Sequence, residues 1–143
     1  MFSKICKGIN TKSFIMAFVA VYAFIFVADW VIHGHLLKGI YQETASLWRP
    51  EEQMKSMCIW MFIGYFFTAK YFTFIFARGC ETSGAAEGFR YGLLVGLLLI
   101  GGCFIQYAIL PIPQALMWYW IATTLFEAIG SGIIVGAIYK KKR

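Results

Sequence analysis

Two residues of opposite charge, Lys70 and Glu127, lie within stretches of otherwise almost wholly apolar sequence. An ionisable side chain at the centre of a bilayer costs about 2.5 to 3.5 kcal/mol on insertion scales, so each one needs a partner, a wet cavity or a function. Counted at 1.5 Å per residue from the same membrane surface, Glu127 lies roughly 18 Å deep and Lys70 roughly 22 Å deep. We therefore predict an intramembrane ion pair, in which each charge offsets part of the other's burial cost.

Three interpretations of these two residues remain open. The pair serves structure alone, or it is a coupling site at which Glu127 exchanges a proton or a cation as Lys70 moves away. In the third interpretation Lys70 extends to the cytoplasmic surface and Glu127 is protonated.

A second polar cluster is predicted near the outer surface, made of Asp29, His33 and Gln106. Asp29 and His33 are four residues apart, so on a helix they share a face and can form a hydrogen bond. A carboxylate behind an imidazole fixes its tautomer, which suits His33 for proton transfer or for binding a metal. His35 is the only other histidine, and a regular helix would not direct residues two apart at one ion. We therefore expect no metal and no cofactor, and a hydrogen-bonded or titrating histidine instead.

Sequence signatures of soluble enzymes are missing: the chain has no phosphate-binding glycine loop, no nucleophile elbow and no HExxH motif. The four cysteines form no CxxC pair and are predicted to be unpaired thiols. No catalytic residue is assigned. The chain is more consistent with a non-enzyme, and acid/base chemistry by Asp29 and His33 on a lipid or quinone is the remaining enzymatic possibility.

The composition indicates the elements that position these residues. Of the 143 residues 60% are hydrophobic and only 14% are charged, which is too apolar for a soluble core of this size. Four windows reach the length of roughly 20 residues that spans a bilayer, at about 14–33, 57–76, 91–110 and 115–139. We predict an all-α membrane protein, a single four-helix transmembrane domain over 1–143 whose short connections favour an antiparallel bundle.

The connections carry their own signals. The outer loop 34–56 has apolar residues at helical spacing, which predicts a short interfacial helix, and Pro50 followed by Glu51 and Glu52 fits the start of a helix that continues into the second span. The cytoplasmic loop 77–90 contains a turn at 82–84, and Glu87 is a possible start of helix three. Pro111 and Pro113 end helix three, so helices three and four form a close hairpin.

The net charge of +6 reflects orientation and gives no indication of nucleic-acid binding, because the basic residues lie at the predicted helix ends. By the positive-inside rule both termini are cytoplasmic. The residues on the predicted cytoplasmic side are Lys4, Lys7, Lys12, Arg78, Arg90 and 140–143, against Lys38, Arg49 and Lys55 outside.

All five tryptophans fall toward the predicted outer side, as an anchoring belt or as the lining of an aromatic cavity. Small residues recur at intervals of four on the last two helices, a spacing that lets helix backbones approach closely. We predict that they pack helices, either within one chain or between the chains of a homodimer. These residues are Gly92, Gly96, Ala128, Gly132 and Gly136.

The segments 33–37, 47–50 and 87–93, together with Tyr41 and the stretch from Glu127 to Tyr139, resemble an uncharacterised family of small four-helix bacterial inner-membrane proteins. The resemblance covers roughly 29–139 and implies a bacterial inner membrane, with no assigned activity. The expected function is that of an accessory or small-ligand-binding bundle with a lipid environment and a possible membrane partner subunit. The alternative is a small proton- or ion-coupled transporter that uses Glu127 and Lys70.

Overall fold

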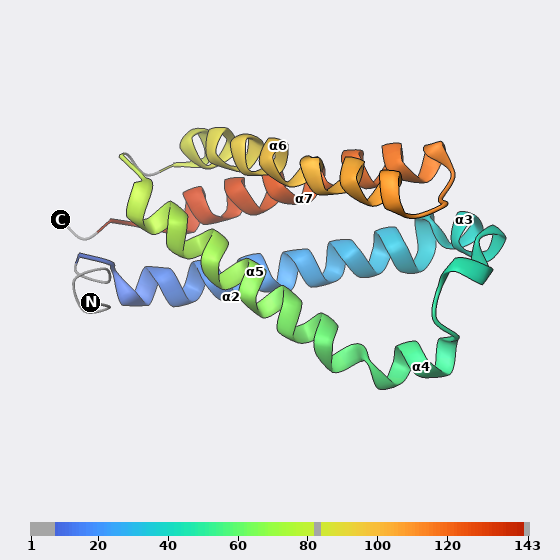
Figure 1. The fold of residues 1–143 in the computed structure, drawn as a ribbon. Coiled ribbons are helices and arrows are strands. Elements are labelled where there is room, and N and C mark those ends of the chain that lie inside the picture. The colour runs from blue at the N-terminus through green and yellow to red at the C-terminus, as the bar shows by residue number, and fades with distance from the viewer. Residues whose placement is uncertain (1–7, 82–83, 142–143) are drawn as a thin grey trace.

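The structure of the protein is a computed structural model that describes residues 8–81 and 84–141. Within these ranges the secondary structure is helical and contains no strand. Four helices are long and apolar enough to cross a membrane, as the sequence predicts for an all-α multi-pass membrane protein. They are α2 (Thr11–Val31), α5 (Cys58–Gly79), α6 (Ala85–Ile109) and α7 (Gln114–Ile138) (Figure 1).

Two of the long helices begin earlier than their apolar windows. The side chain of Asn10 accepts a hydrogen bond from the Ser13 amide at 3.3 Å and so caps α2, which starts at Thr11. Helix α6 starts at Ala85 instead of at residue 91, after Gly84 with its positive φ of 147°. A hydropathy window misses such polar first turns, so the predicted loop 77–90 is too long. Cys6, Lys4, Lys7 and the predicted turn residues Thr82 and Ser83 lie outside the described ranges.

The connection between α2 and α5 is itself mostly helical. Helix α2 continues into a π-helical turn, η1 (Ile32–Leu36), which is followed by α3 (Lys38–Glu43), a 3-10 turn η2 (Ala45–Leu47) and α4 (Glu51–Ser56). Pro50 precedes α4, which carries Glu51 and Glu52 in its first turn. Met57 lies between α4 and α5 and belongs to neither helix. The polar turn that we expected to extend the second membrane helix is therefore a separate short helix.

Helices α6 and α7 pack backbone to backbone. A Cβ added to Gly132 would lie 2.8 Å from the Cα of Gly92, and one added to Gly136 would lie 2.9 Å from the Cα of Gly88. Both distances are too short for any side chain larger than hydrogen. A Cβ added to Gly96 would lie 3.2 Å from the Cβ of Ala128, so positions later in α6 meet positions earlier in α7 and the two helices run in opposite directions. The small residues thus close this helix pair within one chain.

The remaining helices assemble on this pair through two apolar clusters, one at each end of the molecule. Helix α2 packs along α7 and is crossed by α5, which is inclined so that its first turns lie apart from the other helices (Figure 1). We call the end that carries α3 the α3 end, and the end where α2 begins and α7 finishes the terminal end. The cluster at the terminal end includes Ala17, Phe76, Val135 and Tyr139, and the one at the α3 end includes Ala28, Ile32, Leu37, Ile112 and Leu116.

We expect Gly132→Ala to destabilise the protein by about 1–3 kcal/mol, because the added methyl group meets the backbone of α6, which cannot move aside without separating the helices. The measurement is thermal unfolding in detergent followed by circular dichroism. Gly101→Ala is the matched control, since a Cβ at Gly101 meets nothing within 4 Å. Equal unfolding temperatures for the two variants would contradict the close contact.

Candidate functional site

A cavity of about 290 Å³ lies near the α3 end, between α2, α3, α6 and α7. We call it the polar cavity, because most of its lining side chains carry hydrogen-bonding groups. It brings together all three residues of the predicted outer cluster with Glu127 of the predicted ion pair. The lining residues are Asp29, His33, Tyr41, Cys103, Gln106, Trp120, Thr123, Thr124 and Glu127.

A second cavity of about 280 Å³ adjoins the first and shares Cys103, Gln106, Thr124 and Glu127 with it. We call it the apolar cavity, because it continues toward the terminal end between mainly apolar side chains. Besides the shared residues it is lined by Ile25, Thr68, Phe72, Leu99, Gly102, Ala128 and Ser131. Glu127 therefore lies at the boundary between the polar cavity and the apolar cavity.

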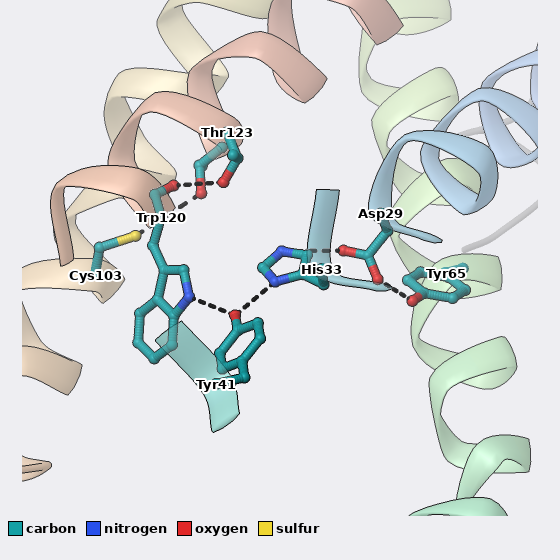
Figure 2. Close-up of polar contacts among 8 residues, drawn as sticks. Asp29, His33, Tyr41, Tyr65, Cys103, Trp120 and Thr123 are labelled. Carbon is teal, nitrogen blue, oxygen red and sulfur yellow. Dashed lines mark hydrogen bonds and ion pairs between the residues drawn. The ribbon is translucent and has the colours of Figure 1, made fainter. Parts of the chain in front are cut away.

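A chain of polar side chains from α2, η1, α3, α5 and α7 runs beside the polar cavity (Figure 2). The Nε2 atom of His33 lies 3.5 Å from Oδ1 of Asp29, and its Nδ1 atom lies 2.6 Å from the hydroxyl of Tyr41 on α3. The same hydroxyl accepts a hydrogen bond from Nε1 of Trp120 on α7 at 2.8 Å. Asp29 also accepts a hydrogen bond from the hydroxyl of Tyr65 on α5. The network joins α2, α3, α5 and α7.

The donors in this network are compatible with a neutral His33 that carries its proton on Nε2. The indole of Trp120 can only donate, so the Tyr41 oxygen accepts from it and the single Tyr41 hydrogen can point at Nδ1 of His33. In that tautomer the Nε2 proton is on the side of Asp29, whose Oδ1 atom is 3.5 Å from Nε2. The two contacts of the Tyr41 hydroxyl hold α3 over the cavity.

The π-helical turn explains why only one of the two histidines reaches the cavity. The Leu37 amide donates to the carbonyl of Ile32 at 2.8 Å, the five-residue spacing that widens the helix at this point. His33 is directed at Asp29 and Tyr41, whereas the ring of His35 packs edge-on against exposed Trp30, with 4.5 Å between ring centroids. The two histidines therefore do not share a ligand. In the described residues no group of three or more His, Cys, Asp or Glu side chains is placed to hold a metal.

One carboxylate oxygen of Glu127 lacks a hydrogen-bond donor among the described residues. Its Oε1 atom is buried and has no hydrogen-bond partner in the described part of the chain. An ionised carboxylate in an apolar environment is costly unless it is paired. This oxygen can be satisfied by a proton, a cation, a water molecule or a ligand with hydrogen-bond donors, and the cavity offers room for any of these.

The expected pair between Lys70 and Glu127 is not formed in this structure. The Lys70 ammonium lies 5.6 Å from the centroid of the Phe66 ring and 5.5 Å from that of Tyr71, on the outward side of α5. Counting residues along a helix estimates depth but not the direction in which a side chain points. Since α5 turns Ala69 and Phe72 toward the other helices, Lys70 faces away from α7.

The five tryptophans divide between the two predicted roles. Trp120 lines the polar cavity, and Trp48 packs against it with 6.2 Å between ring centroids. Trp30, Trp60 and Trp118 are 59%, 66% and 53% exposed, as anchors in a lipid interface would be.

Sequence reasoning did not identify Tyr41, Tyr65 or Trp120 as members of the polar cluster. Tyr41 follows His33 by eight residues, about two turns of helix, and that spacing was an available signal. Tyr65 and Trp120 reach the network from other helices, and no local spacing predicts such contacts.

No protein-family model matches the chain, and no curated protein and no solved structure matches it either. The fold and the site together define a multi-pass membrane protein with a polar cavity near one end of its helices.

We expect Tyr41→Phe to loosen α3, because loss of the hydroxyl leaves the Trp120 indole without an acceptor and His33 without a donor. Amide hydrogen exchange of residues 37–43, followed by mass spectrometry, should become at least several-fold faster. Tyr119→Phe is the matched control, since Tyr119 is 50% exposed on the same helix as Trp120. Unchanged exchange in Tyr41→Phe would contradict the role of the hydroxyl.

Burial raises the pKa of the Tyr41 hydroxyl, an effect that the Trp120 hydrogen bond opposes and the charge of Asp29 reinforces. Because the pKa of Tyr41 is higher in the folded state than in the unfolded state, its protonated form stabilises the fold below pH about 10. This contribution to the free energy of unfolding is lost as the pH rises through the folded-state pKa. We expect wild-type protein to lose stability above pH ~10 more steeply than Tyr41→Phe does. Thermal unfolding across an alkaline pH series measures the difference, and parallel curves would refute it.

Proposed function

We propose that this protein is a small-ligand-binding integral membrane protein whose ligand occupies the joined polar and apolar cavities. The observation that carries the proposal is the buried, unpartnered Oε1 atom of Glu127 at the junction of the two cavities. A bound molecule that offers a hydrogen-bond donor would satisfy this atom. The contacts of the Tyr41 hydroxyl with His33 and Trp120 support a positioning role for these residues.

The membrane arrangement that we propose is an antiparallel four-helix bundle with both termini in the cytoplasm and the α3 end outside. Support comes from the distribution of basic residues. Five of them lie at the terminal end: Lys12, Arg78, Arg90, Lys140 and Lys141. The positive-inside rule assigns the end that is richer in Lys and Arg to the cytoplasm. The α3 end carries Lys38, Arg49 and Lys55. The resemblance to small four-helix bacterial proteins supports the inner membrane of a bacterium as the location.

The proposal is tested by the accessibility of Cys103, which lines both cavities. In a variant with Cys6, Cys58 and Cys80 replaced by Ala, we expect the small neutral reagent methyl methanethiosulfonate to modify Cys103 in the folded protein. Gly102→Leu should slow the reaction at least several-fold by filling the apolar cavity. Gly101→Leu, one residue outside the cavity lining, should not. Intact-mass spectrometry follows the modification, and a Cys103 that reacts only after unfolding would overturn the proposal.

A second candidate function is a small proton- or ion-coupled transporter. It is favoured by one observation, the presence of the two carboxylates Asp29 and Glu127 on the same cavity. Because Lys70 faces away from that cavity, the coupling group in this version is Glu127 without Lys70. In proteoliposomes, Glu127→Gln should then abolish pH-dependent flux while Lys70→Gln leaves it unchanged. A pH profile that survives Glu127→Gln would remove this candidate.

A further inference from the structure

The charges around the joined cavities are of one sign. Asp29 and Glu127 line the polar cavity, and in the described part of the chain neither cavity is lined by Lys or Arg. His33 also lines the polar cavity, and its Nε2 atom lies 3.5 Å from Oδ1 of Asp29, so it is already engaged with that carboxylate. A ligand that carried an anionic group would meet the carboxylate of Glu127 with no Lys or Arg nearby in the described lining, whereas a cation would be attracted by it.

A second unpartnered atom lies one helical turn from Glu127. Ser131 is 1% exposed, its Oγ has no hydrogen-bond partner among the described residues, and its side chain lines the apolar cavity. Residues four apart share a helix face, so the Glu127 carboxylate and the Ser131 hydroxyl address the same space. The carboxylate oxygen accepts, and the hydroxyl can accept as well as donate, so a head group that bears more than one N–H can donate to both.

The cavity lining changes from polar to apolar along its length. Toward the α3 end the wall is formed by Tyr41 and Trp120, aromatic side chains of the type that attract cations. Toward the terminal end it is apolar, and Thr68 on α5 and Leu99 on α6 are exposed at its rim within the membrane-spanning segments. An amphiphile with its charged head at Glu127 and its apolar part between α5 and α6 fits this gradient. Each cavity is near the lower limit of about 300 Å³ for ligand pockets, so the ligand is small.

We propose that the ligand is a small lipophilic ammonium, a protonated primary or secondary amine whose N–H groups bind Glu127 and Ser131 and whose apolar part enters the cavity from between α5 and α6. This inference rests on the proposed ligand-binding function and adds the chemical class of the ligand. A neutral molecule with hydroxyl groups would satisfy the two oxygens but would not respond to the two carboxylates.

The experiment uses three molecules of matched size with the full-length protein in phosphatidylcholine nanodiscs. The Cys103-only variant is treated with methyl methanethiosulfonate in the presence of 2-phenylethylammonium, 2-phenylethanol or phenylacetate. We expect the ammonium to slow modification of Cys103 at concentrations roughly tenfold lower than the alcohol, and the anion to give no protection. Glu127→Gln should raise the protecting concentration of the ammonium roughly tenfold, and Ser131→Ala should raise it by a smaller factor. Glu52→Gln, on exposed α4, removes a negative charge away from the cavity and should change nothing.

The outcomes separate this inference from the proposed function. Modification of Cys103 that the ammonium and the alcohol slow equally would overturn the ammonium class and leave ligand binding in place. Protection by phenylacetate as strong as that by the ammonium would do the same. A Cys103 that the reagent never reaches in the folded protein would overturn both. The comparison of the three molecules on one protein decides the inference even if Glu127→Gln fails to fold.

Discussion

The close contact of α6 and α7 is the constraint on which the other features depend. In a lipid environment no hydrophobic force joins two helices, so association rests on close van der Waals packing, for which glycines at Gly88, Gly92, Gly132 and Gly136 remove the steric obstacle. The backbone-to-backbone contact lies in the half of the pair near the terminal end. Toward the α3 end the two helices meet through larger side chains, which include Cys103, Met117 and Ile121, and Cys103, Gln106, Trp120 and Thr124 line the polar cavity. Tight packing in one half thereby positions a polar opening in the other.

The polar network extends this arrangement to the remaining helices. Asp29, His33 and Tyr41 would each be costly to bury alone, yet their hydrogen bonds satisfy one another and reach Tyr65 on α5 and Trp120 on α7. The widened π-helical turn directs His33 into this network and lets the chain turn into α3. Because α3 is held by side-chain hydrogen bonds and by a small apolar cluster, it is the element most dependent on the state of the cavity.

Glu127 differs from every member of that network, because the fold leaves one oxygen of its carboxylate, Oε1, buried and without a protein partner among the described residues. The proteins in which buried groups remain unsatisfied commonly use them for binding or catalysis, since the energetic cost persists only where something offsets it. The Oγ atom of Ser131, on the same face of α7, likewise is buried and has no hydrogen-bond partner in the described part of the chain. The combination of two unmet acceptors, two carboxylates and an apolar passage is the basis for proposing a ligand and its chemical class.

The sequence by itself determined the four apolar helices and the small residues on α6 and α7 that permit close packing, because apolar length, prolines and small-residue spacing are local properties that act within one helix. It also placed Asp29 and His33 on one helix face and Gln106 at a similar depth. Only the tertiary structure decided which residues face one another across helices. Lys70 and Glu127 lie at similar depths, but rotation about the axis of α5 turns Lys70 outward, and depth alone carries no information on that rotation. The same reason explains why the sequence did not predict Tyr65 and Trp120 as members of the network. Contacts between helices depend on how the helices pack, and the whole assembly sets that packing.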